Sequence, residues 1–485
     1  MKKMKTRPIL YGCLLGSVMF AFASCSDFTD VQPKGKNLLT TTTQLEMLLN
    51  VPFDQDDGDG PQFVGDKIAT LSNIPTLLSQ PTPTRNSIIL SWDESLQDKM
   101  AELTSSDSEY SSYYGVIGTI ANPILMNIGA ASGDEAMKNQ LRCEALTLRA
   151  YFHYLLINKF AKAYNPATAA EDSGLPYLLE TQDIAQPTVQ LTVQEVYDHI
   201  LADIQEAIDL DGLPTSAVNR MRMGKPCAYA VKALALLSMQ RFDEAEEAAR
   251  QSLALNGTVN DYNTMTGTGT NVLGETYEVL LRPRLECEED LFFTYGIEFF
   301  QSITPEAEAR FEPGHASLER IDTANKMYAG LGDMSESMQG IPGLIMTYDL
   351  NSGWNMAGLK TTHMYLIVAE AEIRKGNYDE AMRALDVIRV NRINPEIYQP
   401  LEGTVTTEAD AILHLKQTSH GENIYSVYNF INRKRWNQLD GWKETFTREL
   451  AGNTYTLTPE SPLWIFPIPL NVISNNPSIV QNYKQ

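Results

Sequence analysis

The sequence predicts a mostly α-helical protein that also contains a large irregular segment and a few short strands. Three observations support this fold class: long stretches with apolar residues at helical spacing, two similar helix–turn–helix segments, and regions rich in proline and glycine around them. The chain of 485 residues has 38 basic and 61 acidic side chains. Because such an acidic surface repels phosphate backbones, the composition argues against nucleic acid as a partner.

The N-terminus has the pattern of an export signal that ends at a cysteine. Basic residues precede an apolar run of 15 residues, 9–23, and small residues lead to Cys25. The run is too short to cross a bilayer, which takes about 20 residues. A transmembrane anchor and a plain secretory signal with a chance cysteine are the alternatives. The pattern resembles a bacterial lipoprotein signal, which implies that residues 1–24 are removed and that acyl chains on Cys25 anchor the protein.

The N-terminal half, residues 25–260, is predicted to consist mainly of helices. Threonines cap a first helix over residues 43–50, and residues 51–90 are rich in proline, glycine and aspartate and are predicted to form loops. Helical spacing of apolar residues then predicts helices over 92–104, 113–129, 134–162 and 192–210. Thr192 is a favourable N-cap for the last of these helices.

Two segments, 227–255 and 363–391, align with each other without a gap. Each has the pattern of a helix, a short turn and a second helix, with an aromatic residue at the turn and a small alanine where the paired helices meet, as at Ala245 and Ala381. Both segments resemble tetratricopeptide (TPR) helical hairpins. An isolated hairpin cannot bury its apolar face, so we expect the earlier helices to complete an array.

The C-terminal half, residues 261–485, is predicted to be less regular. Residues 290–295 have the composition of a strand, and a helix is expected over 407–416. The tail, residues 451–485, contains five prolines and is expected to be extended. So much irregular chain is typical of binding loops, and we expect the two halves to pack as one globular unit.

Several motifs in order give the chain a family resemblance. They comprise Ile120–Asn122, Arg142–Tyr151, Gly174–Tyr177, the second hairpin, and the tail with Pro467–Pro469 and Asn475–Pro477. Together with the lipoprotein start, these motifs resemble the SusD/RagB family over nearly the whole mature chain. The family's stretch rich in arginine and glutamate is reduced here to Arg435-Trp436, so the chain resembles a divergent member.

The resemblance implies a function in nutrient uptake. Family members are surface-exposed outer-membrane lipoproteins that bind glycans or other nutrients for a TonB-dependent transporter of the SusC type. The TPR helices are implied to form the scaffold, and the irregular segments the ligand face. A periplasmic TPR adaptor lipoprotein that binds a protein partner is the alternative, and a hydrolase is a third possibility.

The sequence contains no motif that indicates catalysis or a bound cofactor. The HExxH, GxSxG, P-loop and GxGxxG patterns are absent, and the cysteines lack metal-binding spacing. The acidic stretch 54–60 lacks EF-hand spacing and is expected to be a solvated turn. We therefore expect a binding protein without a cofactor or a metal ion.

Aromatic rings and amides are the side chains expected to bind a neutral sugar, since rings stack on C–H faces and amides bond hydroxyls. Trp92 lies at the edge of the loop region, and Trp354 and Asn355 lie in a turn before the second hairpin. These three residues are the predicted ligand contacts, with core packing as the alternative for each tryptophan. Trp436 and Trp464 are expected to be structural.

Overall fold

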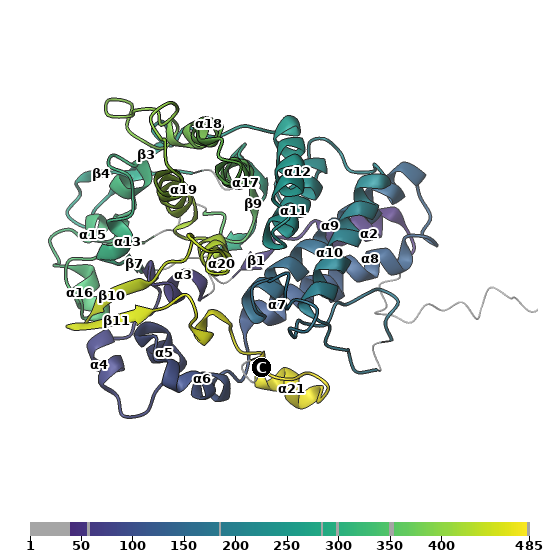
Figure 1. The fold of residues 1–485 in the computed structure, drawn as a ribbon, viewed down its shortest axis with the longest axis horizontal. Helices are drawn as coiled ribbons and strands as arrows, with labels where there is room; N and C mark the ends of the chain where they lie inside the picture. Colours follow the sequence, from purple (N-terminus) through teal and green to yellow (C-terminus); the bar gives the residue numbers. More distant parts are fainter. Residues whose placement is uncertain are drawn as a thin grey trace, which may run out of the picture. The chain divides into compact units, whose positions relative to one another are not determined.

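The computed structural model describes residues 39–55, 59–183, 186–282, 285–296, 300–348 and 354–482. From residue 40 onward, the described residues form one compact unit. The predicted fold class is confirmed, because helices dominate the described chain and its strands are short (Figure 1). Cys25 and the signal segment lie outside the described residues. None of the described helices is both long and apolar enough to cross a bilayer.

The N-terminal helices pack around one long helix. They are α2 (Thr42–Leu49), α7 (Ser108–Val116), the π-helical turn η3 (Ile117–Ala121), α8 (Asn122–Asn127), α9 (Glu135–Phe160) and α10 (Val193–Asp209). α9 has 26 residues, and its C-terminal two thirds are buried among its neighbours. α10 begins where predicted, because Thr192 and Glu195 form a reciprocal capping box.

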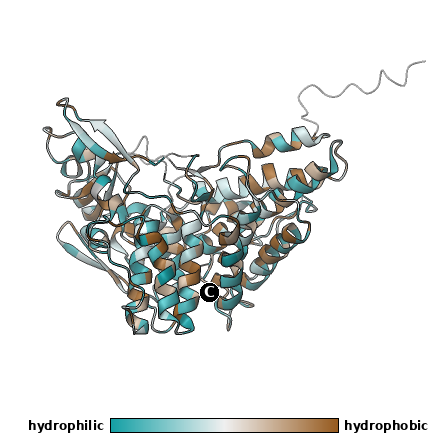
Figure 2. Cartoon of the chain, turned by 90° about the horizontal axis from the view of Figure 1, so that it is seen from above, coloured by the Kyte–Doolittle hydropathy of each residue, from teal (hydrophilic) through white to brown (hydrophobic). Residues whose placement is uncertain are grey.

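The two predicted hairpins are confirmed and lie directly against each other. The first comprises α11 (Lys225–Ser238) and α12 (Phe242–Leu255), and the second α17 (Thr361–Arg374) and α18 (Tyr378–Arg389). α12 packs on α17, although about a hundred residues separate them in the sequence (Figure 1). α19 (Glu408–Asn423) and α20 (Val427–Trp436) continue the array. Figure 2 shows hydrophilic and hydrophobic residues alternating along the helices of the chain, as expected of amphipathic elements.

The prediction that residues 51–90 form loops is wrong in part. Short helices occur here and just beyond: α3 (Gly60–Phe63), α4 (Ile74–Ser79), α5 (Arg85–Ser91), η2 (Glu94–Leu96) and α6 (Gln97–Leu103). Asn73 and Thr84 cap α4 and α5 through their side chains, so local capping starts helices that periodicity missed. The predicted helix over 92–104 begins too early, because Trp92 adopts a left-handed conformation that ends α5.

The strands form small, separate sheets. β1 (Asp54–Gln55) pairs with β6 (Tyr295–Gly296), β3 (Thr266–Thr270) with β4 (Thr276–Leu280), β5 (Asp290–Phe292) with β9 (Leu359–Lys360), and β10 (Phe446–Leu450) with β11 (Asn453–Leu457). A three-stranded antiparallel sheet has the order β2 (Lys67–Ile68), β7 (Gln301–Ile303) and β8 (Ile345–Thr347). This sheet brings the N-terminal loop region beside the irregular C-terminal segment.

Short helices complete the C-terminal half. They are α13 (Pro305–Glu308), α14 (Ala316–Arg320), α15 (Thr323–Met327), α16 (Met334–Gln339), η4 (Pro462–Trp464) and α21 (Leu470–Asn475). α21 corrects the expectation of a fully extended tail. It fits between Pro469, which is its N-cap, and Pro477, so the prolines flank the helix and do not interrupt it.

A buried network of ion pairs joins the irregular segment to the helical array. Arg392 donates to Glu289 at 2.8 Å and to Glu422 at 2.5 Å, and Arg282 donates to Asp290 at 2.6 Å. Each of these side chains is at most 2% exposed. The carboxylates and guanidiniums come from segments far apart in sequence, so the irregular segment shares one polar core with α19 and the chain just after α18.

Candidate functional site

Three aromatic side chains meet beside the three-stranded sheet. Phe300 directly precedes β7, Tyr328 ends α15, and Tyr348 directly follows β8. Because Gln301 pairs with Thr347, the register places Phe300 and Tyr348 opposite each other on neighbouring strands. We call Phe300, Tyr328 and Tyr348 the aromatic surface.

The rings of the aromatic surface stack on one another and stay partly exposed. The Phe300 and Tyr348 centroids lie 4.6 Å apart with an interplanar angle of 24°, and Tyr328 lies 6.2 Å from Phe300. All three side chains are half-buried, and they pack against a core that includes Met334 and Met346. Sugar C–H groups can pack on such rings, because each ring retains accessible area.

Phe300 has a strained backbone. Its φ is +43°, in the left-handed region that a bulky residue rarely adopts. Strain of this kind costs of order 1–3 kcal/mol and persists only where the surrounding structure enforces it, commonly at functional sites. Here the pairing of β7 with β8 holds Phe300 against Tyr348.

Hydrogen bonds to the backbone hold the segments that bear the aromatic surface in place. The Thr323 hydroxyl donates to the Tyr348 carbonyl at 2.8 Å, and the Tyr348 amide donates to that hydroxyl at 2.7 Å. Asn325 donates to the Leu344 carbonyl at 3.0 Å. In the described part of the chain, the hydroxyls of Tyr328 and Tyr348 have no hydrogen-bond partner, so both are available to a ligand.

The N-terminal loop after β2 is tied to the same region. Gln339 donates to the carbonyls of Ile68 and Thr70 at 3.1 and 3.0 Å, and it accepts a 2.5 Å hydrogen bond from Ser302. Gln339 is itself fully buried. The position of this loop beside the sheet is therefore set by hydrogen bonds to the segment that bears the aromatic surface.

Trp354 lies on the far side of β8 from the aromatic surface. It packs against Ile345 and stacks on Tyr425 with a centroid distance of 5.0 Å. The side chain is half-buried, and its buried indole N–H has no hydrogen-bond partner among the described residues. The preceding residues of the predicted turn, 351–353, lie outside the described residues. Trp354 thus stays a predicted ligand contact, on the opposite face of β8 from the aromatic surface.

Trp92 and Asn355 have structural positions, which corrects their prediction as ligand contacts. Trp92 is 3% exposed, donates to the Phe63 carbonyl, and stacks under the Arg448 guanidinium at 3.8 Å. Such a ring has no free face for a sugar. Asn355 is buried and donates to Asp290 at 2.9 Å and to the Phe292 carbonyl at 2.8 Å. Core packing, the alternative for Trp92, is the arrangement observed.

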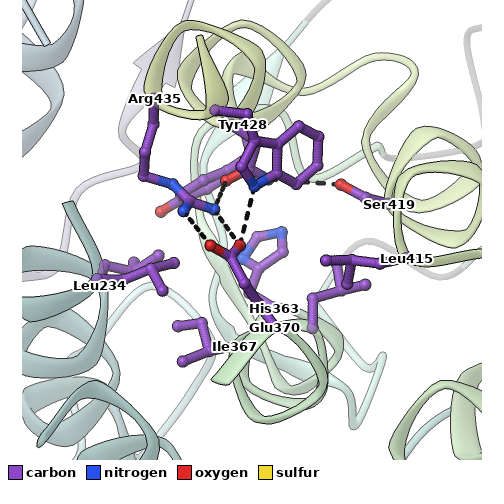
Figure 3. Close-up of a pocket in the computed structure, with 12 residues that line it drawn as sticks. Leu234, His363, Ile367, Glu370, Leu415, Ser419, Tyr428 and Arg435 are labelled. Carbon is purple, nitrogen blue, oxygen red and sulfur yellow. Dashed lines mark hydrogen bonds and ion pairs between the residues drawn. The ribbon is translucent and has the colours of Figure 1, made fainter. Parts of the chain in front are cut away.

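A cavity inside the helical array is too small to serve as a ligand site (Figure 3). Its volume of about 20 Å³ accommodates about one water molecule. Arg435 points across it and donates two 2.6 Å hydrogen bonds to Glu370, and the Trp436 indole donates to the same carboxylate at 2.9 Å. Arg435 and Trp436 therefore bind α20 to α17 through Glu370. This is a structural role, as expected for Trp436.

Buried Glu370 is ionised because of these contacts. Burial by itself would raise the pKa of this carboxyl group, but the Arg435 guanidinium, Arg374 and the Trp436 N–H together lower it to about 2. The charge pair is thus part of the scaffold. Among the described residues, no group of three or more His, Cys, Asp or Glu side chains is arranged to hold a metal ion. Residues 56–58 of the acidic stretch lie outside those described.

Sequence reasoning missed the residues of the aromatic surface. Phe300, Tyr328 and Tyr348 are spread over about fifty residues, and none lies in a recognisable motif. The available signal was weak: each is a large aromatic residue in a region without helical or strand periodicity. Only the pairing of β7 with β8 reveals that they meet.

Comparison with known proteins gives one family match and many similar folds. The family model described as "Starch-binding associating with outer membrane" (SusD-like) matches residues 69–237. No curated protein matches the chain. A SusD superfamily protein from Bacteroides thetaiotaomicron VPI-5482 is 18% identical with a TM-score of 0.62, covering 91% of this chain and 100% of that one.

Two further solved structures have the same fold. A SusD superfamily protein from Bacteroides vulgatus ATCC 8482 is 20% identical with a TM-score of 0.59, covering 91% of this chain and 99% of that one. The surface glycan-binding protein A from Bacteroides uniformis is 14% identical with a TM-score of 0.60. The match covers 92% of this chain and 99% of that one. Residues 69–237 thus match the SusD-like family model, and the chain has the fold of the SusD superfamily structures.

Proposed function

We propose that this protein captures glycan through the aromatic surface and passes it, uncleaved, to a TonB-dependent transporter of the SusC type. The observation that carries the binding proposal is the stacked, half-buried pair Phe300 and Tyr348 with Tyr328 beside it. The family description names starch binding and the outer membrane, and one structure with this fold is named a surface glycan-binding protein. Both support the proposal.

The chemistry of the aromatic surface suits a neutral saccharide. Rings supply flat apolar area for C–H groups, and the unpartnered hydroxyls of Tyr328 and Tyr348 supply hydrogen bonds. The chain has a net charge of −23, which disfavours extended anionic polymers but is indifferent to neutral sugars. Trp354 is included in the proposal as a separate contact on the opposite face of β8.

Calorimetric titration with neutral α-glucan oligosaccharides tests the binding proposal. Tyr348→Ala and Tyr328→Ala are each expected to weaken binding about tenfold or more, because truncating a central aromatic contact typically costs over 1 kcal/mol. Tyr378→Ala is the matched control, since Tyr378 is equally half-buried but begins α18. Unchanged affinity in both surface variants contradicts the proposed site. Release of reducing sugar over time contradicts capture without cleavage.

The proposal includes a lipid anchor on Cys25 that holds the protein at the cell exterior. Palmitate labelling of the intact protein, lost in Cys25→Ala, is the expected result. Protease added to intact cells is expected to digest the protein. Protection from that protease favours the alternative, a periplasmic adaptor that binds another protein through its TPR-like helices.

A further inference from the structure

A second cleft lies away from the aromatic surface, between the end of α9, α20 and the C-terminal tail. Its volume of about 380 Å³ is in the range of small-molecule sites. Lys162 and Asp172 line one side, Lys434 and Gln438 line the α20 side, and Glu460 lies on the tail side. Gln97 and Asn482 also line the cleft, so it is built from several segments that are far apart in the sequence.

Lys434 is a buried lysine without a carboxylate partner, and burial lowers the pKa of its side chain to about 7. Its side chain is 97% buried, given a residual exposure of 3%. The ammonium donates to the carbonyls of Asn158 and Ala161, at 2.8 and 2.6 Å, and lies 5.4 Å from the Phe430 ring centroid. In the protonated form, these two carbonyls occupy two of its three N–H donors. The third has no partner within the described part of the chain.

The other charged groups that line the cleft are already paired. Asp172 accepts from Lys162 at 2.6 Å, and Glu460 pairs with Lys443 at 3.2 Å. Of the described ionisable groups around the cleft, Lys434 is therefore the one that lacks a counter-charge when it is protonated. A buried, unpaired charge is costly, and a ligand carboxylate with a hydrogen bond to the ammonium would offset that cost.

The rest of the lining suits a polyhydroxyl ligand. Asn165, Gln438 and Ser461 present neutral polar groups, and Pro462 and Ile465 add apolar area. Repulsion from acidic side chains outside the cleft acts weakly here, since exposed charges are screened beyond about 10 Å at 0.1 M salt. We propose that this cleft is a second binding site, independent of the aromatic surface, for a saccharide that carries a carboxylate.

A purely structural role for Lys434 makes a different prediction. The two carbonyls lie at the C-terminal end of α9, where a cation stabilises the helix dipole. A lysine with that role alone affects folding stability and binds no ligand. A binding measurement therefore separates the two roles, and the purified full chain, titrated calorimetrically with glucuronate, glucose and acetate, is the test.

Glucuronate is expected to bind at least tenfold more tightly than glucose, which lacks the carboxylate, and than acetate, which lacks the sugar. Lys434→Met is expected to weaken glucuronate binding at least tenfold. Gln438→Trp is the second variant, because Gln438 is exposed at the cleft and a larger ring there blocks it without disturbing the end of α9. If Lys434→Met does not fold, the glucuronate affinity of Gln438→Trp tests the proposed site instead.

Four results overturn the proposal: no glucuronate binding, glucose binding as tightly, acetate binding as tightly, or full glucuronate affinity in Gln438→Trp. Tyr348→Ala is expected to leave glucuronate affinity unchanged. The failure of this inference is therefore distinguishable from the failure of the proposed function, which is measured with neutral oligosaccharides. Loss of glucuronate affinity in Tyr348→Ala contradicts the independence of the two sites.

Discussion

Arg435 and Glu370 illustrate how single residues hold this fold together. Both are buried, and their two hydrogen bonds join α20 to α17 across a cavity that holds about one water molecule (Figure 3). A buried ion pair adds little net stability compared with an apolar pair, but removing one partner leaves an uncompensated buried charge. The sequence shows the Arg-Trp motif, whereas its partner Glu370 is visible only in the structure.

Glu370→Gln tests this pair. The free energy of unfolding is expected to fall by about 3–5 kcal/mol, because the Arg435 guanidinium loses its counter-charge in a buried position. Urea denaturation followed by circular dichroism measures the change. Glu402→Gln is the control, since Glu402 pairs with Arg383 on the surface and its loss is expected to have little or no effect. Equal stability of Glu370→Gln and the wild type contradicts the proposed clamp.

At the scale of elements, small residues decide how closely the hairpin helices approach. Ala245 on α12 and Ala381 on α18 are fully buried, at the equivalent positions that the alignment of the two hairpins identified. α12 also packs on α17 of the other hairpin. The predicted reason for alanine at these positions, close approach of paired helices, agrees with this burial.

Ala245→Leu is expected to destabilise the protein by about 1–3 kcal/mol, because extra methylene groups in a well-packed interface force the side chains or the helices apart. Ala254→Leu on the same helix is the matched control: Ala254 is exposed, and the change is expected to stay within about 0.5 kcal/mol. The midpoint of urea unfolding measures both. A cost for Ala254→Leu as large as that for Ala245→Leu contradicts a packing role specific to Ala245.

At the scale of the whole molecule, buried histidines make folding depend on pH. Burial lowers the pKa of His153, His363 and His420 from 6.5 to about 3. In the unfolded chain these imidazoles take up protons as the pH falls below 6.5, whereas in the folded chain they stay neutral until about pH 3. The unfolded state therefore binds more protons in this window, and stability falls as the pH decreases.

The free energy of unfolding is expected to decrease between pH 6.5 and pH 5, by up to about 1.4 kcal/mol per pH unit for each buried histidine. Urea titrations at several pH values measure this slope. His153→Gln is expected to have a shallower slope, since one fewer imidazole takes up a proton on unfolding. A free energy of unfolding that stays constant or rises as the pH falls from 6.5 to 5 contradicts the lowered pKa values of the buried histidines.

The sequence by itself determined the helical scaffold, the two hairpins and the family resemblance. Helical periodicity, the Thr192 cap and the hairpin alanines are patterns of residues that lie close together in the sequence. They can therefore be recognised in a single sequence. Cys25 and its lipid anchor stay a prediction from the sequence alone.

Tertiary structure decided which side chains meet. Pairing of β7 with β8 joins Phe300 to Tyr348, and long-range packing buries Trp92 and Asn355, which the sequence suggested as ligand contacts. The cleft at Lys434 likewise forms from segments far apart in the chain. Such contacts depend on register and packing across hundreds of residues, for which no local pattern exists.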